Sequence, residues 1–138
     1  MHKRFFALRN GVLADAVKKA GCPCPRVYGL NVPQIASIAR EIGTDDVLAR
    51  KLWTEKECRE SRLLACYLFD ADAMTHEEAL RLAADVQSVE EADMLAFRLL
   101  KRMSHPERIA EALEDSNNES SGSFGSYTAR VLKRHLEN

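Results

Sequence analysis

Apolar residues recur at three- and four-residue spacing along most of the chain, a pattern typical of helices with one buried face. The segment from Ile35 through Ile38 to Ile42 follows this spacing and stops at Gly43. Glycine, proline and capping residues mark where such segments begin and end. The pattern predicts eight helices, at about residues 3–20, 33–43, 45–53, 57–69, 76–86, 89–103, 105–113 and 127–136.

Three of the expected helix starts carry a reciprocal capping pattern, in which Ser or Thr is followed three residues later by Glu. The pairs are Thr75 with Glu78, Ser88 with Glu91, and Ser104 with Glu107. The helix expected at 57–69 ends in an apolar run that covers all its faces. We therefore expect it to be the most buried element.

The arrangement of these segments indicates an all-α fold, because no segment has the alternation of a strand. Helix starts recur at intervals of about 25 to 30 residues, which favours antiparallel helix pairs stacked as a short HEAT-like α-solenoid. A compact helix bundle is the alternative. We expect a single domain over residues 1–138, with a flexible loop at about 115–126, where the sequence is polar and rich in serine and glycine.

Nothing in the apolar pattern predicts a membrane segment or an export signal. The longest apolar run, Leu63 to Phe69, has seven residues, whereas a membrane span needs about 20. The apolar run near the start has four residues, too few for the core of a signal peptide. We expect a cytoplasmic protein whose cysteines stay reduced.

Composition places the chain among globular proteins, with 46% hydrophobic and 30% charged residues. The formal net charge of −1 hides an uneven distribution. Residues 1–69 hold 12 Lys and Arg against 7 Asp and Glu, a balance of +5, and residues 70–138 hold 8 against 14, a balance of −6. The total argues against a uniformly basic nucleic-acid module, while the first half suits an anionic partner.

Metal and cofactor chemistry find little support in the sequence. Cys22 and Cys24 lack the spacing of a zinc ribbon, and Cys58 and Cys66 are eight residues apart on one predicted helix. The four histidines are dispersed along the chain. We expect no metal and no cofactor, and we interpret the cysteines of the helix as packing thiols.

A group of basic residues in the first half is the candidate surface for a phosphate backbone. Stacked helices would bring several of them onto one concave face. Its members are Arg40, Arg50, Lys51, Lys56, Arg59 and Arg62. The alternative is that the interleaved Glu55, Glu57 and Glu60 neutralise them in ordinary surface pairs.

Asp93 is the candidate functional carboxylate. In the helix expected at 89–103 it lies one turn from Val89 and from Phe97, so we expect it to be partly desolvated beside an apolar stripe. Such surroundings recur at functional sites. The alternative is that Asp93 and its acidic neighbours merely favour the positive end of their helix.

Several blocks of the sequence together resemble the AlkD-like family of DNA alkylation repair glycosylases. They are Tyr28-Gly29-Leu30-Asn31-Val32-Pro33, Ile38-Ala39-Arg40, Leu48-Ala49-Arg50-Lys51-Leu52-Trp53 and Arg59-Glu60-Ser61-Arg62-Leu63-Leu64-Ala65. The resemblance covers about residues 9–113. It implies a curved stack of HEAT-like repeats that holds duplex DNA and excises alkylated purines by hydrolysing the N-glycosidic bond.

The resemblance also implies roles for single residues. Asp93 matches the family's catalytic aspartate, Val89 stands where the family has an aromatic residue, and Arg130 or Lys133 would take the place of its basic residue. The chain is also shorter than these enzymes, so we expect their later repeats to be missing. We expect a DNA- or lesion-binding relative with weak or lost glycosylase activity. The alternative is a non-enzymatic helical-repeat scaffold that binds a protein partner or forms a homodimer.

Overall fold

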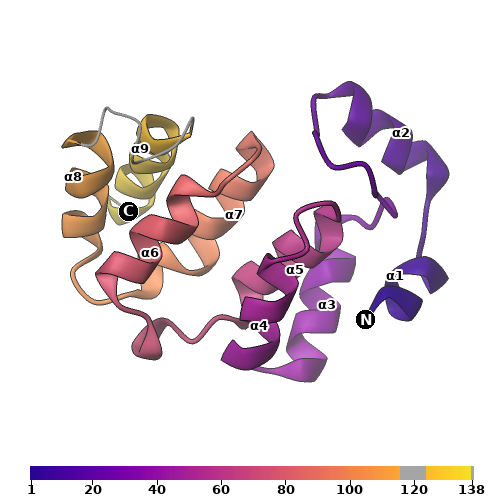
Figure 1. The fold of residues 1–138 in the computed structure, drawn as a ribbon, viewed down its shortest axis with the longest axis horizontal. Helices are drawn as coiled ribbons and strands as arrows, with labels where there is room; N and C mark the ends of the chain where they lie inside the picture. Colours follow the sequence, from indigo (N-terminus) through magenta and orange to yellow (C-terminus); the bar gives the residue numbers. More distant parts are fainter. Residues whose placement is uncertain (116–123, 138) are drawn as a thin grey trace. The chain divides into compact units, whose positions relative to one another are not determined.

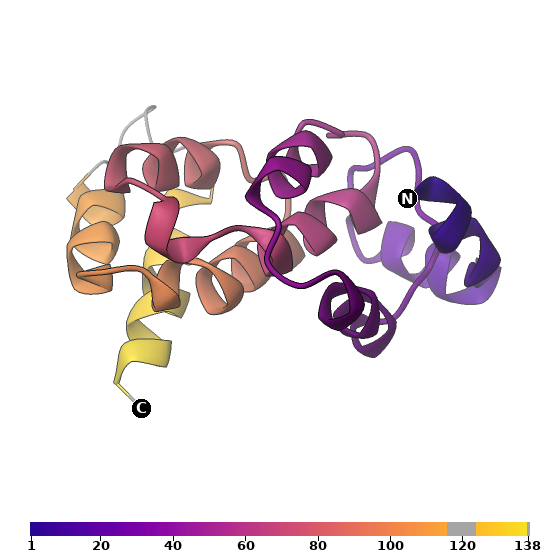
Figure 2. The same cartoon turned by 90° about the horizontal axis from the view of Figure 1, so that it is seen from below.

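The protein is all-helical in the computed structural model, which describes residues 1–115 and 124–137 (Figure 1, Figure 2). Within these ranges the α-helices are α1 His2–Ala7, α2 Gly11–Lys19, α3 Val32–Ile42, α4 Asp46–Trp53, α5 Arg59–Leu68, α6 His76–Ala84, α7 Val89–Arg98, α8 Pro106–Asp115 and α9 Gly125–Leu136. Two short 3₁₀ helices, η1 Ala71–Ala73 and η2 Leu100–Arg102, complete the described elements. The all-α prediction is confirmed, while most of the predicted loop at 115–126 lies outside the described residues.

The chain divides into two compact units, Met1–Phe69 and Asp70–Asn138. This boundary coincides with the change from basic to acidic sequence, so the first unit carries the balance of +5 and the second the balance of −6. That both units act as one domain, in a solenoid, stays a prediction.

Helix α5 forms the centre of the first unit. Every residue of α5 except Tyr67 is buried, and α3 and α4 pack against it. Its apolar run supplies Leu63, Leu64 and Leu68, each fully buried. The expectation of a deeply buried helix at this position is therefore confirmed.

The single helix predicted at residues 3–20 was wrong, because the structure has α1 and α2 with a break between them. Asn10 adopts extended backbone angles and accepts a hydrogen bond from the backbone N–H of Leu13, which makes it the N-cap of α2. Its own backbone N–H donates to the carbonyl of Tyr28 at 2.8 Å instead of continuing α1. A contact distant in sequence thus determines where the second helix begins.

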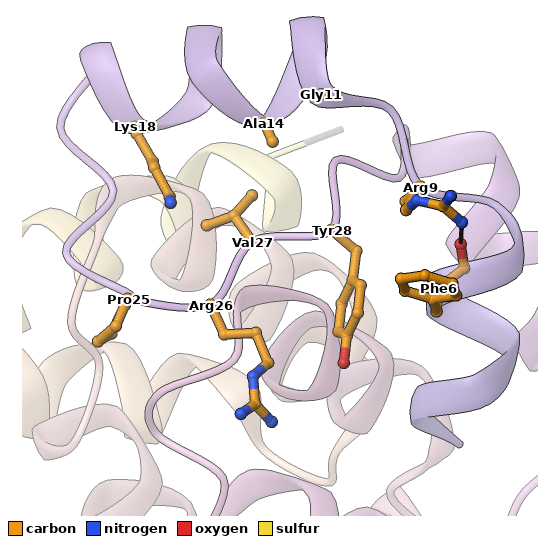
Figure 3. Close-up of a pocket in the computed structure, with 9 residues that line it drawn as sticks. All are labelled: Phe6, Arg9, Gly11, Ala14, Lys18, Pro25, Arg26, Val27 and Tyr28. Carbon is orange, nitrogen blue, oxygen red and sulfur yellow. Dashed lines mark hydrogen bonds between the residues drawn. The ribbon is translucent and has the colours of Figure 1, made fainter.

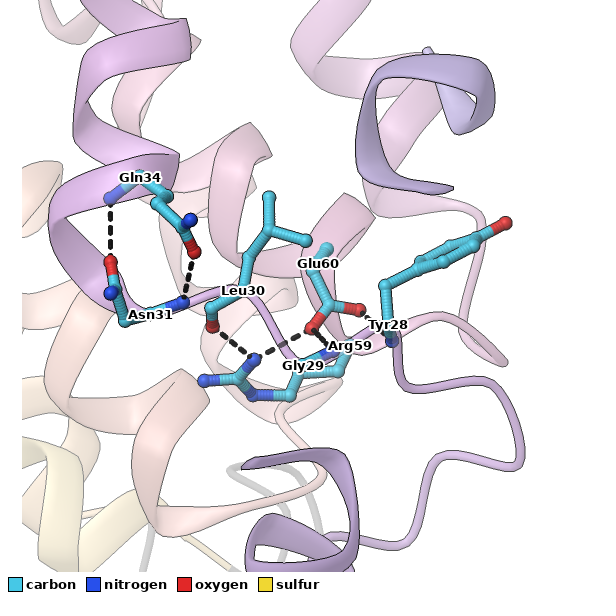
Figure 4. A network of polar contacts seen from close by, with 7 residues as sticks. All are labelled: Tyr28, Gly29, Leu30, Asn31, Gln34, Arg59 and Glu60. Carbon is cyan, nitrogen blue, oxygen red and sulfur yellow. Dashed lines mark hydrogen bonds and ion pairs between the residues drawn. The ribbon is translucent and has the colours of Figure 1, made fainter. Parts of the chain in front are cut away.

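A buried ion pair joins α5 to the segment that precedes α3 (Figure 4). Glu60 is fully buried, and its carboxylate accepts hydrogen bonds from the backbone N–H groups of Tyr28 at 2.9 Å and Gly29 at 3.1 Å. Arg59 Nη1 donates to the same carboxylate at 2.6 Å and to the carbonyl of Leu30 at 2.8 Å. The two charged side chains therefore satisfy each other and three backbone groups in the interior.

Gly29 is required by the same segment. Its φ is +86°, a backbone conformation that residues other than glycine rarely adopt. A Cβ atom at this position would lie 2.1 Å from the carbonyl oxygen of Asn10. The close approach of these two backbones therefore depends on the missing side chain.

A second buried guanidinium anchors the end of α4. Arg62 is fully buried, with its guanidinium carbon 3.6 Å from the centre of the Trp53 ring. Arg62 Nη1 also donates to the backbone carbonyl of Trp53 at 2.8 Å. The hydrogen bond satisfies the orphaned carbonyl at this helix end, and the cation–π contact holds the guanidinium over the ring.

A polar chain ties the start of α1 to the same core. The ring of His2 lies within hydrogen-bond distance of Tyr28 Oη at 2.8 Å and of Glu55 Oε1 at 2.6 Å. Ser61 Oγ donates to the same Glu55 oxygen at 2.7 Å. Burial alone would raise the pKa of Glu55, but the hydrogen bonds from Ser61 and His2 outweigh it and lower that pKa from its usual value.

In the second unit, α8 and α9 pack against each other and α9 also packs against α7 (Figure 1). One half of the reciprocal caps predicted at Thr75 and Ser88 is present, since each side-chain oxygen accepts from the backbone N–H three residues later. The Glu91 carboxylate accepts from the backbone N–H of Gln87, and not from that of Ser88 as the reciprocal pattern expects.

The helix predicted at 89–103 ends earlier, at Arg98, and the chain continues into the short 3₁₀ helix η2. The next helix begins at Pro106, because the backbone N–H of the first helical residue has no partner within the helix and proline lacks that N–H.

We predict that Glu60→Gln destabilises the protein by about 3 to 5 kcal/mol, because it leaves the Arg59 guanidinium buried without a counter-charge. The amide can also accept on one side only, so its NH₂ group would face a backbone donor. Urea denaturation followed by circular dichroism measures the loss. Glu57→Gln, an exposed change in the same segment, is the matched control and should lower stability by less than about 0.5 kcal/mol.

Because the folded pKa of Glu55 lies below its usual value of 4.5, ionised Glu55 stabilises the fold above that pH. This stabilisation is lost as pH falls from 4.5 through the lower folded value. We therefore expect the difference in unfolding free energy between the wild type and Glu55→Gln to be constant near neutral pH and to shrink in acid. A difference that persists unchanged down to about pH 3 would contradict this assignment.

Candidate functional site

The exposed face of α7 carries Val89, Asp93 and Phe97, each one turn from the next. Val89 is 48% exposed and Phe97 is 37% exposed, and Asp93 between them is also exposed. The buried face of α7 holds Ala92, Leu95 and Ala96 instead. The expectation that Asp93 is partly desolvated was wrong, because its apolar neighbours at one-turn spacing are themselves at the surface.

Asp93 is held by a residue of the last helix. The hydroxyl of Tyr127, in the first turn of α9, donates a hydrogen bond of 2.8 Å to Asp93 Oδ1. This bond, followed by partial burial and the negative charge of Asp93, raises the pKa of Tyr127. The phenol therefore stays protonated and remains a donor to the carboxylate.

Further aromatic and basic residues lie on the same two helices and beside them. The guanidinium of Arg130 lies 5.8 Å from the centre of the Tyr127 ring. One turn along α7, the Phe97 ring lies 4.9 Å from that of His135, and Lys101 Nζ lies 4.6 Å from Phe97. We call Asp93, Tyr127, Phe97, Arg130 and His135 the α7–α9 cluster.

The basic residues singled out from the sequence fall into two groups. Arg40, Arg50, Lys51 and Lys56 are exposed in the first unit, as expected for a surface that binds anions, and Arg50 also forms an ion pair with Asp46 at 2.6 Å.

Arg59 and Arg62 instead lie inside that unit, in the buried contacts with Glu60 and Trp53. They have a structural role in this fold, so we leave them out of the candidate surface. The sequence does not distinguish the buried arginines from the exposed cations. Glutamates alternate with the basic residues there, and this pattern is equally typical of surface ion pairs.

In α9, the two basic candidates differ in their surroundings. Arg130 is exposed beside Tyr127, whereas Lys133 forms an ion pair with Glu114 of α8. Arg130 is therefore the candidate that belongs to the α7–α9 cluster.

Two features of the cluster were missed in the sequence. Tyr127 is 34 residues from Asp93, so no local spacing links them. The pairing of Phe97 with His135 likewise depends on the packing of α9 on α7.

The cysteines and histidines do not converge in the described part of the chain. All four cysteines are free, and burial raises the pKa of the Cys58 thiol, which keeps it protonated. In residues 1–115 and 124–137, no group of three His, Cys, Asp or Glu side chains is placed to hold a metal ion. Within the same ranges, no helix is both long and apolar enough to cross a membrane.

These features define an all-helical protein with a basic first unit and an exposed aspartate–tyrosine pair in the second. Residues 1–122 match the model of the family described as DNA alkylation repair enzyme, so the chain belongs to that family. No curated protein and no solved structure matches the chain. The family match includes Asp93 and ends before α9, so Tyr127 and Arg130 lie beyond it.

We predict that Asp93→Asn lowers the pKa of Tyr127, because the substitution weakens the hydrogen bond that the phenol donates and removes the negative charge that opposes its ionisation. Ultraviolet titration of tyrosinate, compared between variant and wild type, measures this shift. Asp72→Asn, which removes an exposed charge of the same unit outside the cluster, is the control. Equal titration curves for wild type and Asp93→Asn would show that the pair does not form in solution.

Proposed function

We propose that the protein binds duplex DNA and recognises alkylated bases through a HEAT-like stack of helix pairs, with weak or lost alkylpurine DNA glycosylase activity. Membership of the DNA alkylation repair family supports the DNA substrate. The observation that carries the finer proposal is the exposed Asp93 carboxylate, fixed by Tyr127 and flanked by Val89.

Asp93 is the proposed catalytic residue. When an alkylated base leaves, positive charge develops on the deoxyribose, and a carboxylate placed beside it lowers the energy of that state. In this chain two features weaken the effect. Water around the exposed carboxylate screens its charge, and the hydrogen bond from Tyr127 already stabilises the anion before any sugar approaches.

Val89 removes a further contribution. In the family this position, one turn before the aspartate, is expected to hold an aromatic side chain that contacts the nucleotide. A valine offers no ring for stacking, and base–aromatic stacking contributes about 1 to 3 kcal/mol per base. The loss of such a contact predicts slower base release, with little effect on binding to the phosphate backbone.

The contacts to that backbone are assigned to exposed cations. In the first unit these are Arg40, Arg50, Lys51 and Lys56, and in α9 Arg130. The half-buried Lys133 of α9, which is paired with Glu114, is a further candidate. Each contact releases a counterion from the DNA, so affinity should fall steeply with salt. A protein-binding scaffold or a homodimer would lack this dependence.

The deciding experiment measures DNA binding and release of 7-methylguanine with the same purified protein. We expect binding that weakens steeply with salt, and at most slow base release. Asp93→Asn should abolish any release while leaving affinity for undamaged duplex equal or tighter, since it removes a negative charge. Asp72→Asn should change neither.

Three outcomes would contradict parts of the proposal. Efficient release by the wild type would overturn weak activity, and release that survives in Asp93→Asn would overturn the role of Asp93. No DNA binding at about 50 mM salt would favour the scaffold.

Val89→Trp tests the opposite change, a gain of activity. Val89 is half-exposed, so a larger ring can replace it at the surface, and we expect the variant to release base faster than the wild type.

A further inference from the structure

The first unit contains a hollow whose lining includes none of the residues proposed above to contact DNA. Its volume is about 420 Å³, and it lies between the end of α1, the helix α2 and the extended segment at residues 25–28 (Figure 3). None of its lining residues is acidic, and three are basic: Arg9, Lys18 and Arg26. We call it the basic pocket.

The three cations come from three different segments. Arg9 follows α1, Lys18 lies in the last turn of α2, and Arg26 belongs to the extended segment. All three are exposed, and Figure 3 shows them placed around the hollow rather than directed at one point. Such spacing suits several phosphates along a strand better than one isolated anion.

The walls of the basic pocket are fixed to each other. The backbone N–H of Asn10 donates to the carbonyl of Tyr28, and the N–H of Tyr28 is held by the buried Glu60 carboxylate. The guanidinium of Arg9 stacks on the Phe6 ring at 3.8 Å and donates to the Phe6 carbonyl at 2.9 Å. One such bond orients a group that carries five N–H donors, so binding an anion would need little rearrangement.

We propose that the basic pocket binds the phosphate backbone of duplex DNA and extends the DNA footprint beyond the residues assigned above. This inference rests on the proposed DNA-binding function. Contacts from Arg9, Lys18 and Arg26 to phosphate oxygens contribute affinity without reading sequence, because phosphates are the same at every position along the strand.

The test is a salt titration of binding to an undamaged duplex by the triple variant Arg9→Gln, Lys18→Gln and Arg26→Gln. Each phosphate contact contributes about 0.9 to the slope of log K against log salt, so the slope should decrease in magnitude by about 2 to 3. The matched control replaces Arg81, Arg102 and Arg108, three exposed cations of the second unit, by Gln. It removes the same charge and should leave the slope unchanged.

Folding and function are separated within the same experiment. All three pocket cations are exposed, so helix content and the urea midpoint should match the wild type. The single variant Lys18→Glu provides a second arm and should weaken binding more than Lys18→Gln, because it repels phosphate. A wild type that fails to bind DNA overturns the proposed function, whereas normal binding by the folded triple variant overturns only the basic pocket.

Discussion

The first unit depends on one buried carboxylate. Glu60 brings a full negative charge into the interior, which is unfavourable unless every oxygen finds a donor, and the fold meets this demand with Arg59 and the N–H groups at Tyr28 and Gly29. That requirement fixes the extended segment against α5. Gly29 then allows the start of α2 to approach it, so one interaction places three segments.

Part of the sequence that resembles the family stabilises the fold. Two of the four blocks that resemble the family, residues 28–33 and 59–65, form the buried ion-pair network, and Arg62 of the second stacks on Trp53 of a third block. The proposed catalytic residue, Asp93, lies outside these two blocks. Asp93 is within the family match, but the tyrosine that holds it comes from α9, beyond the matched residues.

Much of the secondary structure could be predicted because local chemistry determines it. Thr75 and Ser88 cap helices at the expected positions, since a cap needs only the next three residues. The break before α2 and the burial of Arg59 could not be predicted, because both depend on partners brought near by folding. The hydrogen bond between Tyr127 and Asp93 could not be predicted for the same reason, since folding brings these distant residues together.

The stacking of Arg62 on Trp53 has a consequence for spectroscopy. Trp53 is the sole tryptophan of the sequence and is buried in the first unit. Its emission therefore reports on the first unit, whereas far-ultraviolet circular dichroism sums the helices of both. Coincident transitions in the two signals would indicate that the units unfold cooperatively, and separate transitions would give each unit its own stability.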